Sequence, residues 1–194
     1  HTQRRRQRQM CIRDRRYTED REKLWNRLKD GTIDCIVTDH APHTLESKSV
    51  GFPNAPAGMP GVETSLPLML THAVEGRCSV SEVVKWMCAG PAKVYGIKNK
   101  GHLKEGYDGD LTLVDLENRR IIQDSDTWTK VGWTPYEGME LTGWPMYTIV
   151  DGNVVHRREP EGPLRGKSIS LPGSTGRVLK LSLIHISEPT RRYR

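Results

Sequence analysis

The sequence lacks several features that would assign it to a class of protein at once. Its 194 residues include a single Phe, and no apolar run reaches the roughly 18 residues needed to span a membrane. The four cysteines form no Cys-x-x-Cys pair, so neither a disulfide framework nor a thiolate zinc site is indicated. We therefore expect reduced thiols in a cytoplasmic protein. No apolar segment follows the Arg-rich start, which argues against a secretory signal peptide.

The net positive charge of the chain comes from its two ends. The formal net charge is +6, but residues 1–16 carry +6 and residues 174–194 carry +4, so residues 17–173 carry −4. Basic tails can bind nucleic acid or membranes, which leaves that function open for the ends alone. For the mildly acidic body we expect no nucleic-acid partner and no membrane partner.

The terminal segments also differ from the body in having no apolar periodicity. Residues 1–16 and 171–194 resemble translated sequencing-adapter sequence, and the alternative interpretation is a disordered basic tail. In either case we expect few long-range contacts from them. The body then divides into residues 17–97 and residues 98–170.

Residues 17–97 show helical patterns around one strand-like run. A helix is predicted from residue 18 to the Asp30-Gly31 pair, followed by a buried strand over residues 32–38, which are rich in Ile, Val and Thr. A long loop rich in Gly and Pro is expected over residues 44–62. Further helices are predicted over residues 62–74, from Ser81 to about residue 87, and over residues 91–95. The segment Ser79-Val80-Ser81-Glu82 is the cap signal for the second of these. An αβ unit of this kind builds parallel sheets.

Residues 98–170 have the pattern of a small β domain. Residues 110–116 alternate as a strand does, and residues 144–155 predict two strands joined by a tight turn at Asp151-Gly152. Residues 131–139 are expected to form an ordered surface loop. Trp133 and Trp144 are the predicted anchors that hold this domain on the helical part.

The densest group of side chains able to bind a metal or a substrate is Asp39, His40 and His43, around Pro42. Barrel enzymes present catalytic groups at the carboxyl ends of their strands, which is where these residues follow the predicted strand. A lone acid after a strand is more often a helix cap or a surface residue, so the assignment needs a wider pattern. His72, on a predicted apolar helix face, is expected to be structural rather than a ligand.

The wider pattern comes from two motifs, TDHAPH at residues 38–43 and APAGMPGVET at residues 55–64. Together they resemble the dihydroorotases, which belong to the metal-dependent amidohydrolases. KGHLKEG at residues 100–106, GWTPY at residues 132–136 and GWP at residues 143–145 extend the resemblance over residues 17–170. The resemblance implies an α/β fold, the C-terminal portion of a (β/α)8 TIM-type barrel plus part of a small β-sandwich domain.

The same resemblance implies a reaction and roles for four residues. The reaction is the reversible cyclisation of N-carbamoyl-L-aspartate to (S)-dihydroorotate in de novo pyrimidine biosynthesis, with two zinc ions (Zn²⁺) per active site. By similarity Asp39 is a metal ligand and the general acid/base, and His43 binds the substrate carboxylate. Ala57 and Gly58 contact this small-molecule substrate through the backbone. A homo-oligomer, or an aspartate transcarbamoylase partner, is implied as well.

The sequence also lacks features that the dihydroorotases carry. It has no His-x-His pair and none of the upstream metal and substrate residues, so we expect a C-terminal portion that is inactive alone. One alternative is another cyclic amidase, a dihydropyrimidinase or an allantoinase, and His43 and the Ala57-Gly58 pair weigh against it. The other is a catalytically dead amidohydrolase-like binding domain, and Asp39 weighs against that.

Overall fold

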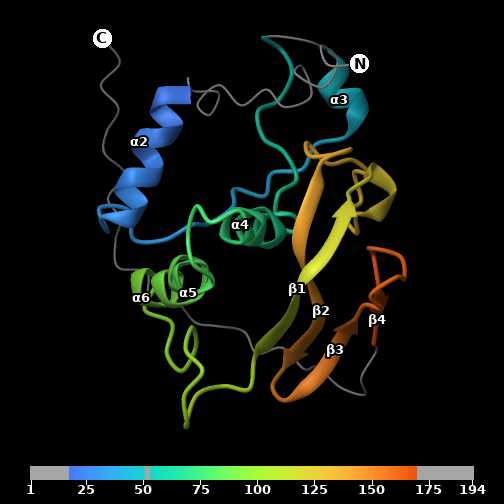
Figure 1. Ribbon diagram of the computed structural model, residues 1–194. Helices are drawn as coiled ribbons and strands as arrows, with labels where there is room; N and C mark the ends of the chain where they lie inside the picture. Colours follow the sequence, from blue (N-terminus) through green and yellow to red (C-terminus); the bar gives the residue numbers. More distant parts are fainter. Residues whose placement is uncertain (1–17, 51–52, 170–194) are drawn as a thin grey trace.

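The computed structural model describes residues 18–50 and 53–169, which form a helical part followed by a four-stranded sheet (Figure 1). The helical part comprises, in chain order, α2 (Thr18–Lys29), α3 (Leu45–Ser49), α4 (Ser65–Val74), α5 (Val80–Val84), the π-helix η1 (Lys85–Ala89) and α6 (Gly90–Val94). The sheet comprises β1 (Leu111–Ile121), β2 (Glu140–Val150), β3 (Asn153–Arg157) and β4 (Lys167–Ser168), and the short 3-10 helix η2 (Asp124–Asp126) lies between β1 and β2.

Helix α2 ends as the sequence predicts. Acidic residues lie in its first turn and basic residues in its last, which is the distribution that the helix dipole favours. Gly31 then takes a φ of +82°, a left-handed conformation that glycine adopts without strain. The amide of Ile33 donates back to the carbonyl of Arg27 at 2.9 Å and fixes the exit of the chain.

The buried strand predicted over residues 32–38 is wrong. The segment is extended, but it belongs to no strand, and the Val37 side chain is 58% exposed. A buried parallel strand needs neighbouring strands to satisfy its backbone groups, and no described segment pairs along this one. The segment instead docks on a helix, where the amide of Ile36 donates to the carbonyl of Trp86 at 2.9 Å. The predicted loop over residues 44–62 is also interrupted, by the short helix α3.

The helix that receives this extended segment changes its hydrogen-bonding pattern at η1. Ser79 begins α5 with a reciprocal capping box to Glu82, as the sequence predicts. Within η1 the amide of Gly90 bonds to the carbonyl of Lys85, five residues back, so the carbonyl of Trp86 is left to accept from Ile36. Gly90 is required here, because a Cβ would lie 2.5 Å from the Asp34 carbonyl oxygen.

The sheet is antiparallel throughout, with strand order β1-β2-β3-β4. The predicted hairpin between β2 and β3 is confirmed: Asp151 and Gly152 have φ values of +50° and +77°, and two positive φ values are what a type I′ turn needs. Within the described residues these four strands form one sheet.

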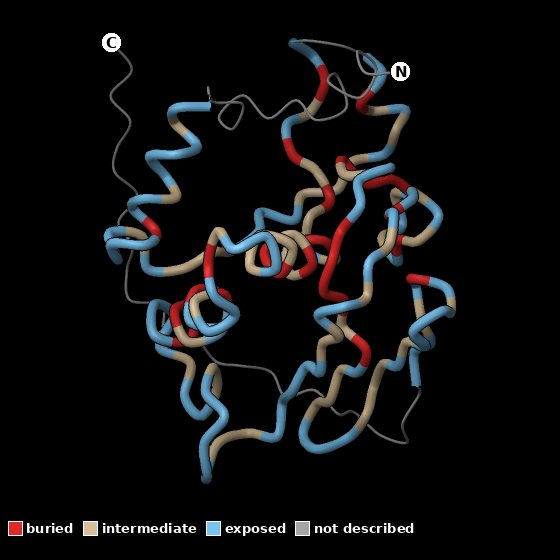
Figure 2. Tube along the Cα trace, in the orientation of Figure 1, coloured by how far each residue is buried: buried red, intermediate tan, exposed pale blue. Residues whose placement is uncertain are grey.

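Helix α4 packs on β2 and joins the two parts. The hydroxyl of Thr71 accepts from the amide of Thr142 at 2.9 Å, and Gly143 allows Leu70 to approach, since a Cβ there would lie 2.5 Å from the Leu70 Cβ. Figure 2 shows that buried residues follow the helices around α4 and run along β2. One apolar cluster contains Leu28, Met69, Leu70, Cys78, Val83 and Trp86, and a second contains Ile122, Leu141, Trp144 and Leu164.

Two expectations concern the chain outside this folded body. In the described part of the chain, no helix combines the length and apolar character needed to cross a membrane. The tails predicted over residues 1–16 and 171–194 lie outside the described residues, so the expectation that they make few contacts stays a prediction.

Candidate functional site

The segment that carries Asp39 lies directly against the glycine-proline loop. His40 forms an isolated parallel bridge with Met59, and the amide of Ala41 donates to the carbonyl of Met59 at 3.3 Å. Gly58 makes this approach possible: its φ is +109°, and a Cβ there would lie 2.7 Å from both the Cβ and the carbonyl oxygen of Ala41. The two motifs recognised in the sequence are therefore one structural unit.

His40 ties the same two segments together through its side chain. Its Nδ1 atom accepts hydrogen bonds from the amides of Gly61, at 3.2 Å, and Val62, at 3.3 Å. Gly61 is also packed closely, since a Cβ there would lie 2.7 Å from the Thr38 hydroxyl oxygen. These bonds of His40 could not be predicted from the sequence, because its partners are backbone groups more than 20 residues away.

A hollow of about 280 Å³ opens where these segments meet. Asp39 and Gly58 both line it, so the structure brings together two of the four predicted site residues. Neither His43 nor Ala57 is among the described residues that form its wall. Ala57 is exposed, and His43 is half-buried. The remaining lining residues are Ile36, Val37, Thr38, Met59, Gly61, Ser65, Leu68, Met69 and Tyr136.

Tyr136 reaches this hollow from the connection between β1 and β2. Burial raises the pKa of its phenol, so the hydroxyl stays protonated through the neutral range. The side chain also packs against the apolar cluster around Trp144. The β domain therefore supplies one wall of a hollow that the sequence assigns to the helical part alone.

A second contact from the same connection reaches His43. Trp133 is 1% exposed, and its indole N–H donates to the His43 carbonyl oxygen at 2.8 Å. The prediction that Trp133 anchors the β domain on the helical part is confirmed by this bond. Its partner could not be read from the sequence, because the two residues are 90 positions apart.

The described residues do not form a zinc site by themselves. Zinc in proteins usually has three or more protein ligands. Asp39 offers a suitable carboxylate, but residues 18–50 and 53–169 contain no group of three His, Cys, Asp or Glu side chains able to share an ion. A metal at Asp39 would need ligands from elsewhere.

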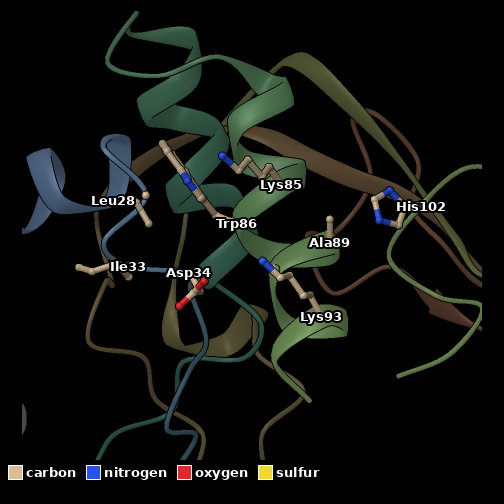
Figure 3. Close-up of a pocket in the computed structure, with 10 residues that line it drawn as sticks. Leu28, Ile33, Asp34, Lys85, Trp86, Ala89, Lys93 and His102 are labelled. Atoms are coloured by element: carbon tan, nitrogen blue, oxygen red, sulfur yellow. The ribbon is translucent and has the colours of Figure 1, made fainter. Parts of the chain in front are cut away.

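A larger hollow of about 480 Å³ lies away from Asp39, between the end of α2 and the helical run from η1 to α6. Figure 3 shows Lys85 and Lys93 extending from that run toward the side on which Trp86 and Asp34 lie. None of the predicted site residues lines it. Volume alone therefore does not select the functional site, and the hollow at Asp39 is the better candidate because it joins both motifs.

His72 lies on α4 in a setting that fits the predicted structural role. Its ring meets that of Trp25 edge to face, with the centroids 5.1 Å apart. Its Nδ1 atom is 3.4 Å from the Glu75 carboxylate, which is a loose contact on the same helix. The ring packs against an aromatic side chain, and its Nδ1 atom is buried with no hydrogen-bond partner among the described residues.

Comparison with known proteins finds one matching family model and a set of similar curated proteins. The family model described as Amidohydrolase family matches residues 3–155. A curated protein named dihydroorotase from Pyrococcus furiosus is 40% identical over 171 residues, which cover 88% of this chain and 40% of that protein. The dihydroorotase from Halobacterium salinarum is 42% identical over 149 residues, 77% of this chain and 35% of that protein. The chain thus spans between a third and two fifths of these relatives.

Solved structures give a consistent result. The L-hydantoinase (dihydropyrimidinase) from Arthrobacter aurescens is 35% identical with a TM-score of 0.73, covering 82% of this chain and 35% of that one. The D-hydantoinase (dihydropyrimidinase) from Thermus sp. has a TM-score of 0.73 at 26% identity, covering 84% of this chain and 36% of that one. The likeness confirms the predicted fold class, an α/β chain that forms part of a TIM-barrel enzyme together with a small sheet.

Proposed function

The chain belongs to the amidohydrolase family, and from this premise we propose that it is the C-terminal portion of a dihydroorotase. The intact enzyme would interconvert N-carbamoyl-L-aspartate and (S)-dihydroorotate in cytoplasmic pyrimidine synthesis. The observation that carries the proposal is the identity of 40–42% to relatives named dihydroorotase, against 35% or less to the hydantoinase structures. Residues 17–97 would complete its barrel and residues 98–170 its β domain, and a homo-oligomer or an aspartate transcarbamoylase partner remains part of the proposal.

Asp39 is the residue that we propose moves the proton. In the hydrolytic direction water adds to a ring carbonyl carbon, the adjoining C–N bond breaks, and a proton passes from the water to the ring nitrogen. The Asp39 carboxylate would take that proton and deliver it to the nitrogen, and the reverse transfer would serve ring closure. Its exposure at the hollow supports this role, because a proton carrier must be reachable by the substrate.

Three further residues would hold the substrate. A dihydroorotate carboxylate needs a hydrogen-bond donor, and the His43 imidazole can supply one. Ala57 and Gly58 would contact the substrate through backbone groups, which a glycine exposes without a blocking side chain. Gly58 already lines the hollow beside Asp39. Ala57 directly precedes Gly58, and His43 lies two residues beyond Ala41, whose amide bonds to the Met59 carbonyl.

Two zinc ions belong to the proposal for the intact enzyme only. Bound zinc would acidify a water molecule to near neutrality and polarise the ring carbonyl. Asp39 would be the ligand that this chain contributes. Because the described residues do not complete a zinc site, we assign no step to the metal here.

The alternative is a dihydropyrimidinase, which the 35% identity and the TM-score of 0.73 to the Arthrobacter aurescens structure favour. The two functions differ in one substrate group, because dihydrouracil is dihydroorotate without its carboxylate. A site built to pair a substrate group discriminates strongly against an analogue that lacks it. We therefore expect kcat/KM of the intact, zinc-loaded enzyme to be at least roughly 100-fold higher for dihydroorotate than for dihydrouracil.

The same measurement, extended to allantoin, separates the candidates. Equal or faster turnover of dihydrouracil would replace the dihydroorotase proposal with the dihydropyrimidinase one. An intact protein that binds zinc and turns over allantoin alone would be an allantoinase. One that binds zinc but turns over none of the three compounds would be a catalytically dead relative that acts as a binding domain. Hydantoin serves as a fourth substrate, since it also lacks the carboxylate and has a smaller ring.

A further inference from the structure

The connection between β1 and β2, residues 122–139, is a closed loop that we call the β1–β2 connection. Its two ends are joined by backbone hydrogen bonds, from the Ile122 amide to the Met139 carbonyl at 3.0 Å and from the Gly138 amide to the Ile122 carbonyl at 2.7 Å. Inside it, the Asp124 carboxylate accepts from the Thr134 amide at 2.8 Å. These internal hydrogen bonds stabilise the conformation of the β1–β2 connection, so it can bind other segments in a defined place.

The β1–β2 connection forms hydrogen bonds with both motif segments of the candidate site. On one side the buried indole of Trp133 donates to the His43 carbonyl oxygen at 2.8 Å. On the other side the two carboxylate oxygens of Glu63 accept from the amides of Trp128, at 2.8 Å, and Thr129, at 2.9 Å. Glu63 lies two residues beyond Gly61, at the end of the glycine-proline loop. Both motif segments are therefore hydrogen-bonded to the same connection of the β domain.

His43 has little local structure to hold it. It lies between Pro42 and Thr44, the N-cap of α3, and outside any strand or helix. Thr44 caps α3 by accepting from the amide of Ser47, so the helix begins only after His43. A backbone in this position can turn about its own dihedral angles. The bond from Trp133 restrains the carbonyl of His43, and with it the backbone from which the imidazole extends.

We infer that Trp133 is a positioning residue for His43, through which the β domain sets the place of the substrate-anchoring imidazole. The kinetic part of this inference rests on the proposed function, in which His43 holds the substrate carboxylate. Its structural part does not. Trp133 touches no reacting atom, so its loss should weaken substrate binding and leave the chemical step almost unchanged.

The test uses Trp133→Phe in the intact enzyme, with Trp144→Phe as the matched control. Both tryptophans are buried, and each indole N–H donates to one backbone carbonyl, His43 for Trp133 and Leu141, at 3.0 Å, for Trp144. Both variants lose similar packing and one hydrogen bond. We expect Trp133→Phe alone to raise KM for dihydroorotate by roughly 3- to 10-fold at nearly constant kcat, the worth of one hydrogen bond.

Hydrogen–deuterium exchange of residues 43–50 gives a readout that needs no substrate. Faster exchange there is expected in Trp133→Phe and not in Trp144→Phe. Should Trp133→Phe fail to fold, benzothienylalanine at position 133 keeps the shape of the indole and lacks only its N–H. If the unsubstituted enzyme did not turn over dihydroorotate, the proposed function would be wrong. The comparison of hydrogen exchange would still decide whether Trp133 holds the backbone at His43. Equal exchange in the two variants, or equal changes in KM, would overturn the inference.

Discussion

His40 and Gly61 are joined by a hydrogen bond in which the Gly61 amide donates to the Nδ1 atom of His40 at 3.2 Å. The next amide, of Val62, donates to the same atom at 3.3 Å. An imidazole nitrogen that accepts carries no proton, so the ring proton of a neutral His40 lies on Nε2. The residue beside the proposed general acid/base therefore holds the glycine-proline loop in place.

Substitution of His40 can distinguish which ring nitrogen matters. The amide oxygen of Asn reaches about as far as Nδ1, and that of Gln about as far as Nε2. We expect His40→Asn to preserve slow hydrogen exchange at residues 61 and 62, and His40→Gln to lose about 0.5–1.5 kcal/mol of local protection there. Mass spectrometry on the intact enzyme measures both. If Gln preserved protection better than Asn, the acceptor would be Nε2 and the account of the loop would be wrong.

Gly58→Ala tests the close approach of the two segments. The new Cβ would lie 2.7 Å from Ala41, and φ is +109°, so both contact and backbone conformation oppose it. Gly76→Ala is the matched control, because Gly76 also has a positive φ, +80°, with nothing within 4 Å of the Cβ position. We expect a cost of about 1 kcal/mol for Gly76→Ala and at least about 2 kcal/mol for Gly58→Ala.

Thermal unfolding of the two alanine variants gives the comparison. The difference between them isolates the contact with Ala41 from the cost of a left-handed backbone. Equal melting temperatures would show that the segments can separate at no cost, and the hollow at Asp39 would then not be a defined site.

A cluster of charged side chains, Lys100, Asp108 and Asp110, is hydrogen-bonded to the tip of the β2–β3 hairpin. The Lys100 ammonium contacts the carboxylates of Asp110 and, at 3.1 Å, Asp108, while Asp110 also accepts from the Asp151 amide at 2.8 Å. The hydrogen bond from Lys100 lowers the pKa of Asp110, and the bond to Asp110 raises the pKa of Lys100. A lowered acid pKa stabilises the fold above the ordinary pKa of Asp and loses that effect on acidification. A raised lysine pKa stabilises it below the ordinary pKa of Lys.

The stabilisation by this cluster of charged side chains should therefore be constant across the neutral range. We expect Lys100→Met to lower the stability by about 0.2–1 kcal/mol between about pH 5 and pH 9, with the loss shrinking below about pH 4. Lys104→Met, at an exposed neighbouring lysine, should have almost no effect. Melting temperatures across this pH range measure it. A loss that grew on acidification would contradict the assignment.

Features with a local cause could be predicted from the sequence. The end of α2 at Gly31, the capping box at Ser79 and the turn at Asp151-Gly152 each depend on a few neighbouring residues, and all three are present. The strand over residues 32–38 was wrong because strand formation needs partners elsewhere in the chain. Its apolar pattern is real, but the segment uses its amide at Ile36 to dock on a helix.

Some features of the candidate site could also be predicted from the sequence, and others could not. The family resemblance assigned Asp39 and Gly58 to one site, and in the structure both residues line one hollow. The hydrogen bonds from Gly61 to His40 and from Trp133 to His43 could not be predicted, because each joins a side chain to a backbone group far away in sequence. Such partners follow from the folded arrangement and leave no periodic signal.

We propose that Asp39 carries the proton in an intact dihydroorotase. The turnover of dihydroorotate by the Asp39→Asn enzyme tests this role most directly. Asn keeps the shape and removes the base, so kcat should fall by roughly 10²–10⁴-fold. His43→Ala should instead act mainly on KM. Metal content must be matched to the unsubstituted enzyme, since an emptied site would imitate a lost base. Near-normal kcat in a metal-replete Asp39→Asn enzyme would contradict the account and leave Asp39 as a surface acid.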